Sequence, residues 1–375
     1  MSNIRLTSIL KLSLLSAVLA FTSNVFADPV KAAFVYIGPT GDHGWTFAHD
    51  QGAKYVKEHM GDDVVITTVE SVAENSDSER TITSLARKND IIFTTSFGYM
   101  NPTIKVAKRY PDVKFEHATG YMLADNVSVY SARFYEGRHI IGKLAGKMTK
   151  SNVIGYIASF PIPEVIRGIN SAYLAAKSVN PDIQIKIVWV YTWYDPGKEA
   201  DAANALIAQG ADIIMQHTDS TAAMTVAEET EGVYAFGQAS DMGEWGPTSQ
   251  LTGIIDDWGP YYLARVQAVK DGTWTSTDTF DGIAEGMVEF APMANMPKEK
   301  ISWPVVITCI IVAFIFFGDF VLDYFGFKGV NETVEVVYDE IKERSDEKIT
   351  KSEPKSEPKS EPKSEPKSEP KSEPK

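Results

Sequence analysis

Short apolar runs alternate with helical patterns along most of the chain, and this alternation is the strongest constraint on its fold. The runs that we predict as strands are 32–37, 64–69, 90–95, 114–118, 127–132, 153–158, 185–190, 212–216, 233–237 and 251–256. Helical patterns fill most of the gaps, for example at 78–88, 135–148, 164–178, 198–209 and 222–229. This order predicts parallel, doubly wound sheets. Because roughly ten strands are too many for one ordinary sheet, we expect two α/β lobes of about 120 residues each.

The loop after the first predicted strand is rich in turn formers. It is the stretch 38–49 (GPTGDHGWTFAH), which precedes a helical pattern at 47–59. In open α/β sheets, ligands bind at the carboxyl ends of the strands. Trp45 in this loop therefore either caps the core or offers an aromatic platform to a planar ligand. The glycine spacing fits neither a phosphate loop ending in Gly-Lys-Ser/Thr nor a dinucleotide-binding GxGxxG.

Aromatic, hydroxyl, amide and carboxylate side chains recur in the loops at the other strand ends. The candidate ligand-binding residues in these loops and the first one are Trp45, Thr46, Phe97, Tyr99, Trp193, His217, Asp219, Gln238, Asp241 and Asp256. Such carboxylates can form an acid/base set, but in a cleft they more often accept hydrogen bonds from ligand N–H or O–H groups.

No catalytic or metal-binding motif accompanies these loops. There is no Gly-x-Ser-x-Gly elbow, the only cysteine is Cys309, and the histidines show no HxxxH or HExxH pairing. We therefore predict no catalytic residues, no metal and no cofactor. The net charge of −14 argues against a nucleic-acid partner. A two-lobed α/β protein without catalytic machinery is most economically a solute-binding protein that closes by hinge motion.

The two ends of the chain predict export and a membrane anchor. Residues 1–27 combine basic residues, an apolar run and a small-x-small cleavage pattern before Asp28, as in a secretory signal peptide. Residues 303–325 are predicted as a transmembrane helix, although the uncharged run 305–318 is short and Asp319 and Asp323 follow it. The alternative is a buried or partner-bound helix. We predict a charged helical segment at 326–350, and disorder in the Ser-Glu-Pro-Lys repeat at 351–375.

Several short segments, in their order and spacing, carry a family resemblance. They are GDHGWT at 41–46, IFTTSFGYMNP at 92–102, FYEG at 134–137, IGYIA at 154–158, VNPD at 179–182, WYDPGK at 193–198, QGADI at 209–213 and FGQASD at 236–241. Over about 31–292 the chain resembles the basic membrane protein (BMP) family of ABC-transporter substrate-binding proteins. The resemblance implies the type I periplasmic-binding-protein fold, with two Rossmann-like lobes. The first lobe would comprise 28–133 with 257–272, and the second 134–256 with 273–297.

The resemblance also implies a ligand. Members bind purine nucleosides or bases between two stacked aromatics, which would be Trp45 and Trp193 here. His217, Asp219, Gln238 and Asp241 would then contact the purine edge. Nucleoside-binding members carry other residues where Thr119, Ala239 and Asp256 stand, so a free base such as adenine is expected.

The resemblance implies a role as well. It is capture of that solute in the periplasm, at the outer face of the cytoplasmic membrane, for an ABC permease. The alternatives are a membrane-tethered sensor that uses the same cleft and a purine-processing hydrolase.

Overall fold

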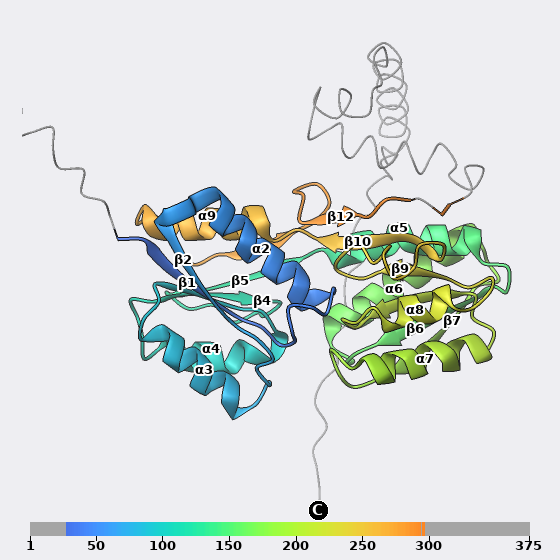
Figure 1. The fold of residues 1–375 in the computed structure, drawn as a ribbon, viewed down its shortest axis with the longest axis horizontal. Helices are drawn as coiled ribbons and strands as arrows, with labels where there is room; N and C mark the ends of the chain where they lie inside the picture. The colour runs from blue at the N-terminus through green and yellow to red at the C-terminus, as the bar shows by residue number, and fades with distance from the viewer. Residues whose placement is uncertain (1–27, 294, 297–375) are drawn as a thin grey trace, which may run out of the picture. The chain divides into compact units, whose positions relative to one another are not determined.

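The computed structural model describes residues 28–293, 295 and 296, which form two open α/β sheets (Figure 1). The first sheet has the strand order β11-β5-β4-β3-β1-β2 and the second the order β12-β10-β9-β8-β6-β7. Apart from β12, which runs antiparallel to β10, every strand pairing in both sheets is parallel. The two-lobed α/β architecture expected from the strand–helix alternation is therefore confirmed.

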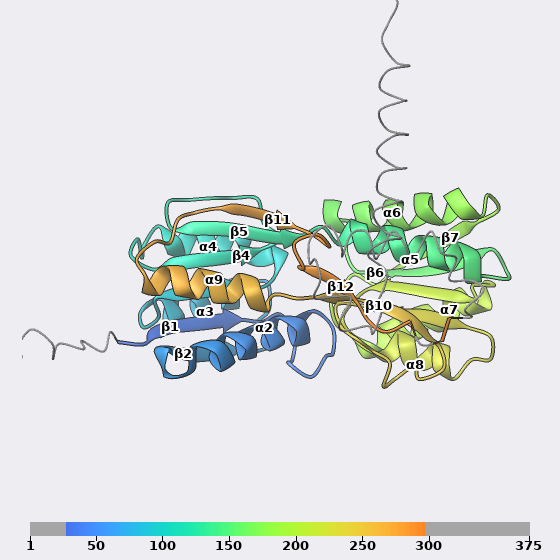
Figure 2. The ribbon, with the colours of Figure 1, turned by 90° about the horizontal axis from the view of Figure 1, so that it is seen from above.

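Helices cover both faces of the first sheet (Figures 1 and 2). Its strands are β1 (Val30–Val35), β2 (Val64–Val69), β3 (Ile91–Thr94), β4 (Lys114–Ala118), β5 (Val127–Ala132) and β11 (Asp278–Asp281). The helices α2 (Trp45–Met60) and α9 (Gly259–Lys270) pack on one face, and α3 (Ser76–Ala86) and α4 (Met100–Ala107) on the other. Side chains alternate between the faces along β1: Phe34 packs toward α2 and α9, and Val35 toward α3. Both are fully buried, which explains why this strand reads as a continuous apolar run.

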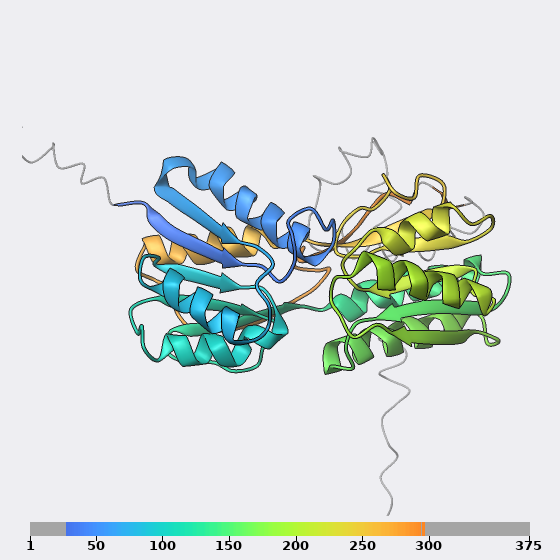
Figure 3. The same ribbon diagram turned by 60° about the horizontal axis from the view of Figure 1, so that its bottom comes forward.

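The second sheet is built in the same way (Figure 3). Its strands are β6 (Val153–Ala158), β7 (Gln184–Trp189), β8 (Ile213–His217), β9 (Tyr234–Gly237), β10 (Gln250–Asp256) and β12 (Val288–Phe290). The helices α5 (Phe134–Met148) and α6 (Pro163–Val179) cover one face, and α7 (Pro196–Ala208) and α8 (Ala222–Glu228) the other. The helices α5 and α6 approach closely because Gly142 has no side chain: a Cβ there would lie 2.4 Å from the carbonyl oxygen of Ala172.

The chain crosses between the sheets after β5, after β10 and after β11. Our expectation that 273–297 lies wholly in the second lobe is therefore wrong. The strand β11 pairs with β5 in the first sheet, and β12 pairs with β10 in the second. Each strand extends an edge of its own sheet, where it satisfies backbone groups that would otherwise be exposed. The other lobe boundaries stay predictions.

Four of the predicted segments lie outside the described residues. They are the signal peptide (1–27), the transmembrane helix (303–325), the charged helical segment (326–350) and the Ser-Glu-Pro-Lys repeat (351–375). Among the residues that the structure does describe, no helix has the length and apolar character needed to cross a membrane.

Candidate functional site

A cleft opens between the two sheets, at the carboxyl ends of their strands. The free volume inside it is only about 20 Å³, room for about one water molecule, so a larger ligand enters only when the lobes or side chains move apart. The first lobe lines it with Ile37, Trp45, Ser96, Phe97 and Thr119, and the second with Glu164, Trp193, His217, Asp219 and Gln238. These residues lie at or after the ends of β1, β3, β4, β6, β7, β8 and β9. The residue types in the loops after the strands predicted a binding site at this edge of the sheets.

The structure brings six of the predicted site residues together in this cleft: Trp45, Phe97, Trp193, His217, Asp219 and Gln238. Asp256 lies buried at the end of β10, and its carboxyl interacts electrostatically with Glu164 in the cleft wall. Thr46, Tyr99 and Asp241 do not line the cleft.

Those three side chains stabilise the loops around it. The hydroxyl of Thr46 accepts a hydrogen bond from the backbone N–H of Gly38 at 3.1 Å. Tyr99 is buried and donates its hydroxyl proton to the carbonyl of Val72. The exposed Asp241 accepts hydrogen bonds from its own loop and from a glutamine side chain.

Trp45 presents a fixed aromatic surface to the cleft. It begins α2, and its indole Nε1–H donates to the carbonyl oxygen of Thr95 at 2.6 Å. Three further rings make edge-on contacts with the indole. The centroid distances are 4.4 Å to His49, 5.6 Å to Trp258 and 5.9 Å to Phe134. Because one hydrogen bond and three ring contacts fix the indole, little side-chain entropy remains to be lost on ligand binding.

Trp193 is the aromatic side chain that the second lobe contributes. It follows β7, and its ring lies 5.2 Å from that of Phe160 between centroids. Its backbone carbonyl accepts a hydrogen bond from the N–H of Asp219 at 3.0 Å, which ties the loop after β7 to the loop after β8. The indole Nε1–H is buried and has no partner within the described part of the chain.

A buried arginine supports the polar wall of the second lobe. Arg138 extends from α5 and donates to the side-chain oxygen of Gln238. Because a guanidinium only donates, it holds the Gln238 amide with its oxygen turned to Arg138, and the amide nitrogen is the group left to meet a ligand. The guanidinium also lies over the ring of Tyr156, 5.7 Å from its centroid.

Next to this pair lie an imidazole and two carboxyl groups. Nε2 of His217 is 3.5 Å from Oε1 of Glu164. Both carboxyl oxygens of Asp256 and Nδ1 of His217 are buried, and in the part of the chain that the structure covers they make no hydrogen bond. Burial raises the pKa of Asp256 to about 8, against an opposing effect of Arg138. Burial likewise lowers the pKa of His217. Near neutral pH, both groups are therefore mostly uncharged.

The two lobes also meet beside the cleft. A Cβ on Gly44 would lie 2.2 Å from the backbone carbonyl oxygen of Asp219, so the loops approach as closely as only glycine permits. Ser240 donates to the carbonyl of His43, whose ring lies 4.3 Å from that of Trp245. The structure therefore shows the lobes in contact around the cleft.

Carboxyl groups gather at this contact. Burial raises the pKa of Asp219 well above its usual value, and the charges of Asp42 and Glu199 add to the effect. Burial also raises the pKa of Asp42 to about 6, although Asp42 accepts backbone hydrogen bonds from Gly44, Thr46 and Phe47 at the start of α2.

Sequence reasoning missed Arg138 and Glu164. Glu164 stands in the first turn of the helix that follows β6, at the strand edge already singled out, but it reads as an ordinary acidic residue of a first helical turn. Arg138 lies inside α5, where no loop or motif marks it. Only the packing of α5 beneath the cleft reveals its role.

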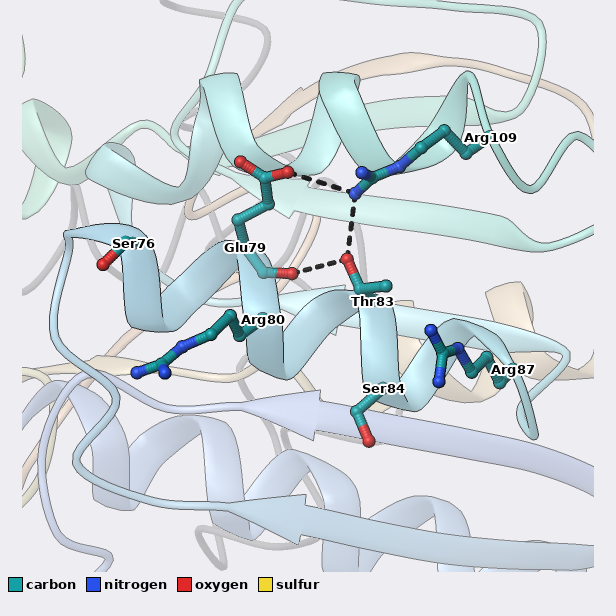
Figure 4. A pocket seen from close by; sticks show the side chains of 7 residues that line it. All are labelled: Ser76, Glu79, Arg80, Thr83, Ser84, Arg87 and Arg109. Carbon is teal, nitrogen blue, oxygen red and sulfur yellow. Dashed lines mark hydrogen bonds and ion pairs between the residues drawn. The ribbon is translucent and has the colours of Figure 1, made fainter.

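A larger hollow of about 480 Å³ lies on the outer surface of the first lobe, on α3 and beside Arg109 (Figure 4). It is a shallow surface depression that is widely open to solvent. Its charged groups largely pair with one another: Glu79 accepts from Lys105 at 2.7 Å and from Arg109 at 3.2 Å, and Arg109 also donates to Thr83. We assign the functional site to the smaller cleft, where buried polar atoms face a partly enclosed space.

Comparisons with known proteins agree with a solute-binding cleft. The family described as "ABC transporter substrate-binding protein PnrA-like" matches residues 29–304. A purine-binding protein of Brucella abortus (strain 2308) is 59% identical over 273 residues, which are 72% of this chain and 78% of that protein. A protein of Haloferax volcanii, provisionally named an ABC transporter glucose-binding protein, is 42% identical over 69% of this chain and 66% of its own length.

A solved structure supports the fold. An ABC-transporter solute-binding protein from Conexibacter woesei matches with a TM-score of 0.61 and 21% identity, over 76% of this chain and 96% of that one. The matching family consists of solute-binding proteins of ABC transporters rather than enzymes, and such proteins act outside the cytoplasm with a small-molecule ligand and a permease as partners.

Proposed function

Because the chain belongs to the PnrA-like (BMP) family of ABC-transporter substrate-binding proteins, we propose that its cleft captures a purine base. The observation that carries the proposal is the pair of tryptophans, Trp45 from one lobe and Trp193 from the other, which line the same cleft. The similarity to a relative named as purine-binding supports it. The bound base is delivered to the membrane permease.

Stacking on the tryptophans supplies the affinity. A purine is a flat π system, and an indole on each face removes both faces from water. Base–aromatic stacking contributes about 1–3 kcal/mol per base. Since Trp45 and Trp193 belong to different lobes, a base between them holds the lobes together, which is how a hinged binding protein closes on its ligand.

The polar wall supplies the specificity. The edge of a purine carries donors and acceptors side by side, so it needs groups of both kinds. Among the lining residues, the Gln238 amide nitrogen can only donate, whereas a neutral His217 can both donate and accept. Nδ1 of His217 and Nε1 of Trp193 are buried and unpaired among the described residues, so a ligand without matching edge groups is costly to bind, because these polar atoms then stay unsatisfied.

The same wall favours a free base over a nucleoside. In nucleoside-binding members, the positions of Thr119, Ala239 and Asp256 serve the ribose. Here Ala239 is buried and offers only a methyl group, which cannot hydrogen-bond. A ribose would therefore lose the hydrogen bond that the side chain at position 239 supplies in those members.

A sugar is the second candidate ligand, because the Haloferax volcanii relative is named as glucose-binding. Sugar rings also lie on aromatic faces, but they offer hydroxyl groups instead of a flat edge of ring nitrogens. Titration with adenine and with glucose separates the two candidates.

Calorimetry on tryptophan variants tests whether the base stacks between Trp45 and Trp193. We expect Trp45→Ala and Trp193→Ala each to weaken adenine binding by about 1–3 kcal/mol. The matched control is Tyr191→Ala, because Tyr191 is an aromatic residue of the same loop as Trp193 but is 64% exposed and does not line the cleft. Unchanged affinity for adenine in both tryptophan variants would contradict stacking of the base between the two indoles.

A further inference from the structure

A second hollow adjoins the cleft and is larger than it. Its free volume is about 320 Å³, part of it open to solvent, and it shares Phe97, Thr119 and Glu164 with the cleft. It lies between the β4, β5 and β11 edge of the first lobe and the first turns of α6 in the second. We propose that this hollow is a subsite for an apolar, ring-bearing substituent on the bound base. The proposal rests on the proposed function, because the base in the cleft carries the substituent.

The walls of the hollow suit a flat apolar group. They are mostly apolar, and Tyr121 and Phe280 contribute large rings that are 73% and 39% exposed. Exposed large apolar groups that gather at one concave place mark a binding surface more often than scattered ones do. Ile162, on the opposite side, adds an aliphatic surface from the residue just before α6.

Arg167 completes the far wall. Its guanidinium lies 5.1 Å from the centroid of the Phe280 ring and 5.5 Å from that of Tyr135. These cation–π contacts hold Phe280 and Arg167 in place before any ligand arrives. A ring entering the hollow therefore meets surfaces that are already ordered.

The loop that carries Tyr121 is held by its backbone. Thr119 has φ +59°, and a Cβ on Gly120 would lie 2.1 Å from Cδ2 of His117. The loop thus packs directly on the His117 ring, and Nδ1 of that ring is 3.0 Å from the hydroxyl of Thr94. The N–H of Tyr121 also donates to Sδ of Met100 at 3.5 Å. These contacts fix the loop, so Tyr121 is exposed because of its position and not because its loop lacks packing.

The shared residues mark the place where the two spaces adjoin. Phe97 and Thr119 come from the first lobe, and Glu164 comes from the second. A substituent that leaves the base between these three side chains passes from the narrow cleft into the wider hollow. On the proposed function, unsubstituted adenine lies only between the two tryptophans, so the two spaces can be tested separately.

Substituted adenines test the subsite. The probes are adenine, adenine with a benzyl group on its exocyclic amine, and adenine with a benzyl group on ring nitrogen 9. They are titrated into the full-length protein and into Phe280→Ala and Tyr121→Ala. We expect one benzyl derivative to bind wild type at least as tightly as adenine. Each wall variant should weaken that derivative about tenfold, as loss of one stacking contact does, and weaken adenine less than about threefold. The control is Leu174→Ala, which removes a 65% exposed apolar side chain of α6 outside the hollow.

Each outcome decides between named alternatives. If both benzyl derivatives bind at least tenfold more weakly than adenine, the hollow does not accept such a group. If one binds well but neither wall variant weakens it, the hollow is only the opening of the cleft to solvent. Either result overturns the subsite and leaves the purine function standing. Failure of adenine to bind wild type overturns the proposed function, and the subsite with it. If Phe280→Ala misfolds, Tyr121→Ala still tests the hollow, because Tyr121 is exposed.

Discussion

Replacing Asp256 by asparagine should make the protein more stable near neutral pH, and the gain should vanish in acid. The carboxyl of Asp256 is fully buried, both of its oxygens lack hydrogen-bond partners among the described residues, and its pKa rises from 3.8 to about 8. The folded state therefore keeps a proton that the unfolded state releases above about pH 4. Between those two values stability falls as pH rises, by about 1.36 kcal/mol per pH unit. From about pH 4 to about pH 7 the loss amounts to about 4 kcal/mol.

Asparagine has nearly the shape of the protonated acid but does not titrate. The free energy of unfolding, measured in urea at about pH 4 and about pH 7, should therefore shift in favour of Asp256→Asn by up to about 4 kcal/mol between the two conditions. Other buried acids, Asp219 among them, titrate in both proteins, so the difference between variant and wild type isolates Asp256. Asp241→Asn, at an exposed carboxylate, is the control. A variant that gains nothing between the two pH values would refute a neutral, buried Asp256.

Two further predictions concern the closed cleft and its ligand. Gly44→Ala places a methyl group 2.2 Å from the carbonyl oxygen of Asp219. It should weaken adenine binding by about 1–3 kcal/mol, the usual cost of overpacking. In calorimetry, Gly41→Ala in the same loop should bind like wild type, because nothing lies within 4 Å of its added Cβ, and equal affinity of both variants would contradict closure at Gly44. In competition experiments adenine should displace adenosine, since Ala239 cannot hydrogen-bond a ribose through its side chain; a clear preference for adenosine would contradict this.

Most strands could be located from the sequence because their physical signal is local. The predicted bounds of β2, β4, β5 and β6 coincide with the observed ones. Buried parallel strands are continuous apolar runs, and turn formers bound them. The first residues of the helices were harder to predict, because the capping residue decides where a helix begins. The helix α3 starts earlier than predicted, at a turn in which the side chain of Asn75 accepts the backbone N–H of Asp77.

The strands β11 and β12 could not be placed in the same way. The segment Asp278–Asp281 is short and polar at both ends, so its pattern does not say which sheet edge it joins. Strands that follow each other in the sequence usually lie in the same sheet, and these two do not. The observed pairing depends on two distant edges, β5 and β10, whose availability is a property of the whole fold.

The residues of the candidate site also differ in whether a local sequence signal marks them. The aromatic residues of the cleft stand in loops after strands, where the topology of α/β sheets makes a binding site expected. Arg138 belongs to a helix, and its role depends on how closely α5 packs beneath the cleft. The neutral state of Asp256 is likewise a consequence of burial, which a sequence pattern does not give.

Calorimetric titration of the ligand-free, full-length protein with adenine and with glucose tests the central claim most directly. The account predicts that adenine binds saturably at a single site and that glucose gives no heat beyond dilution. Saturable binding of glucose without binding of adenine would contradict the purine assignment and favour the sugar ligand.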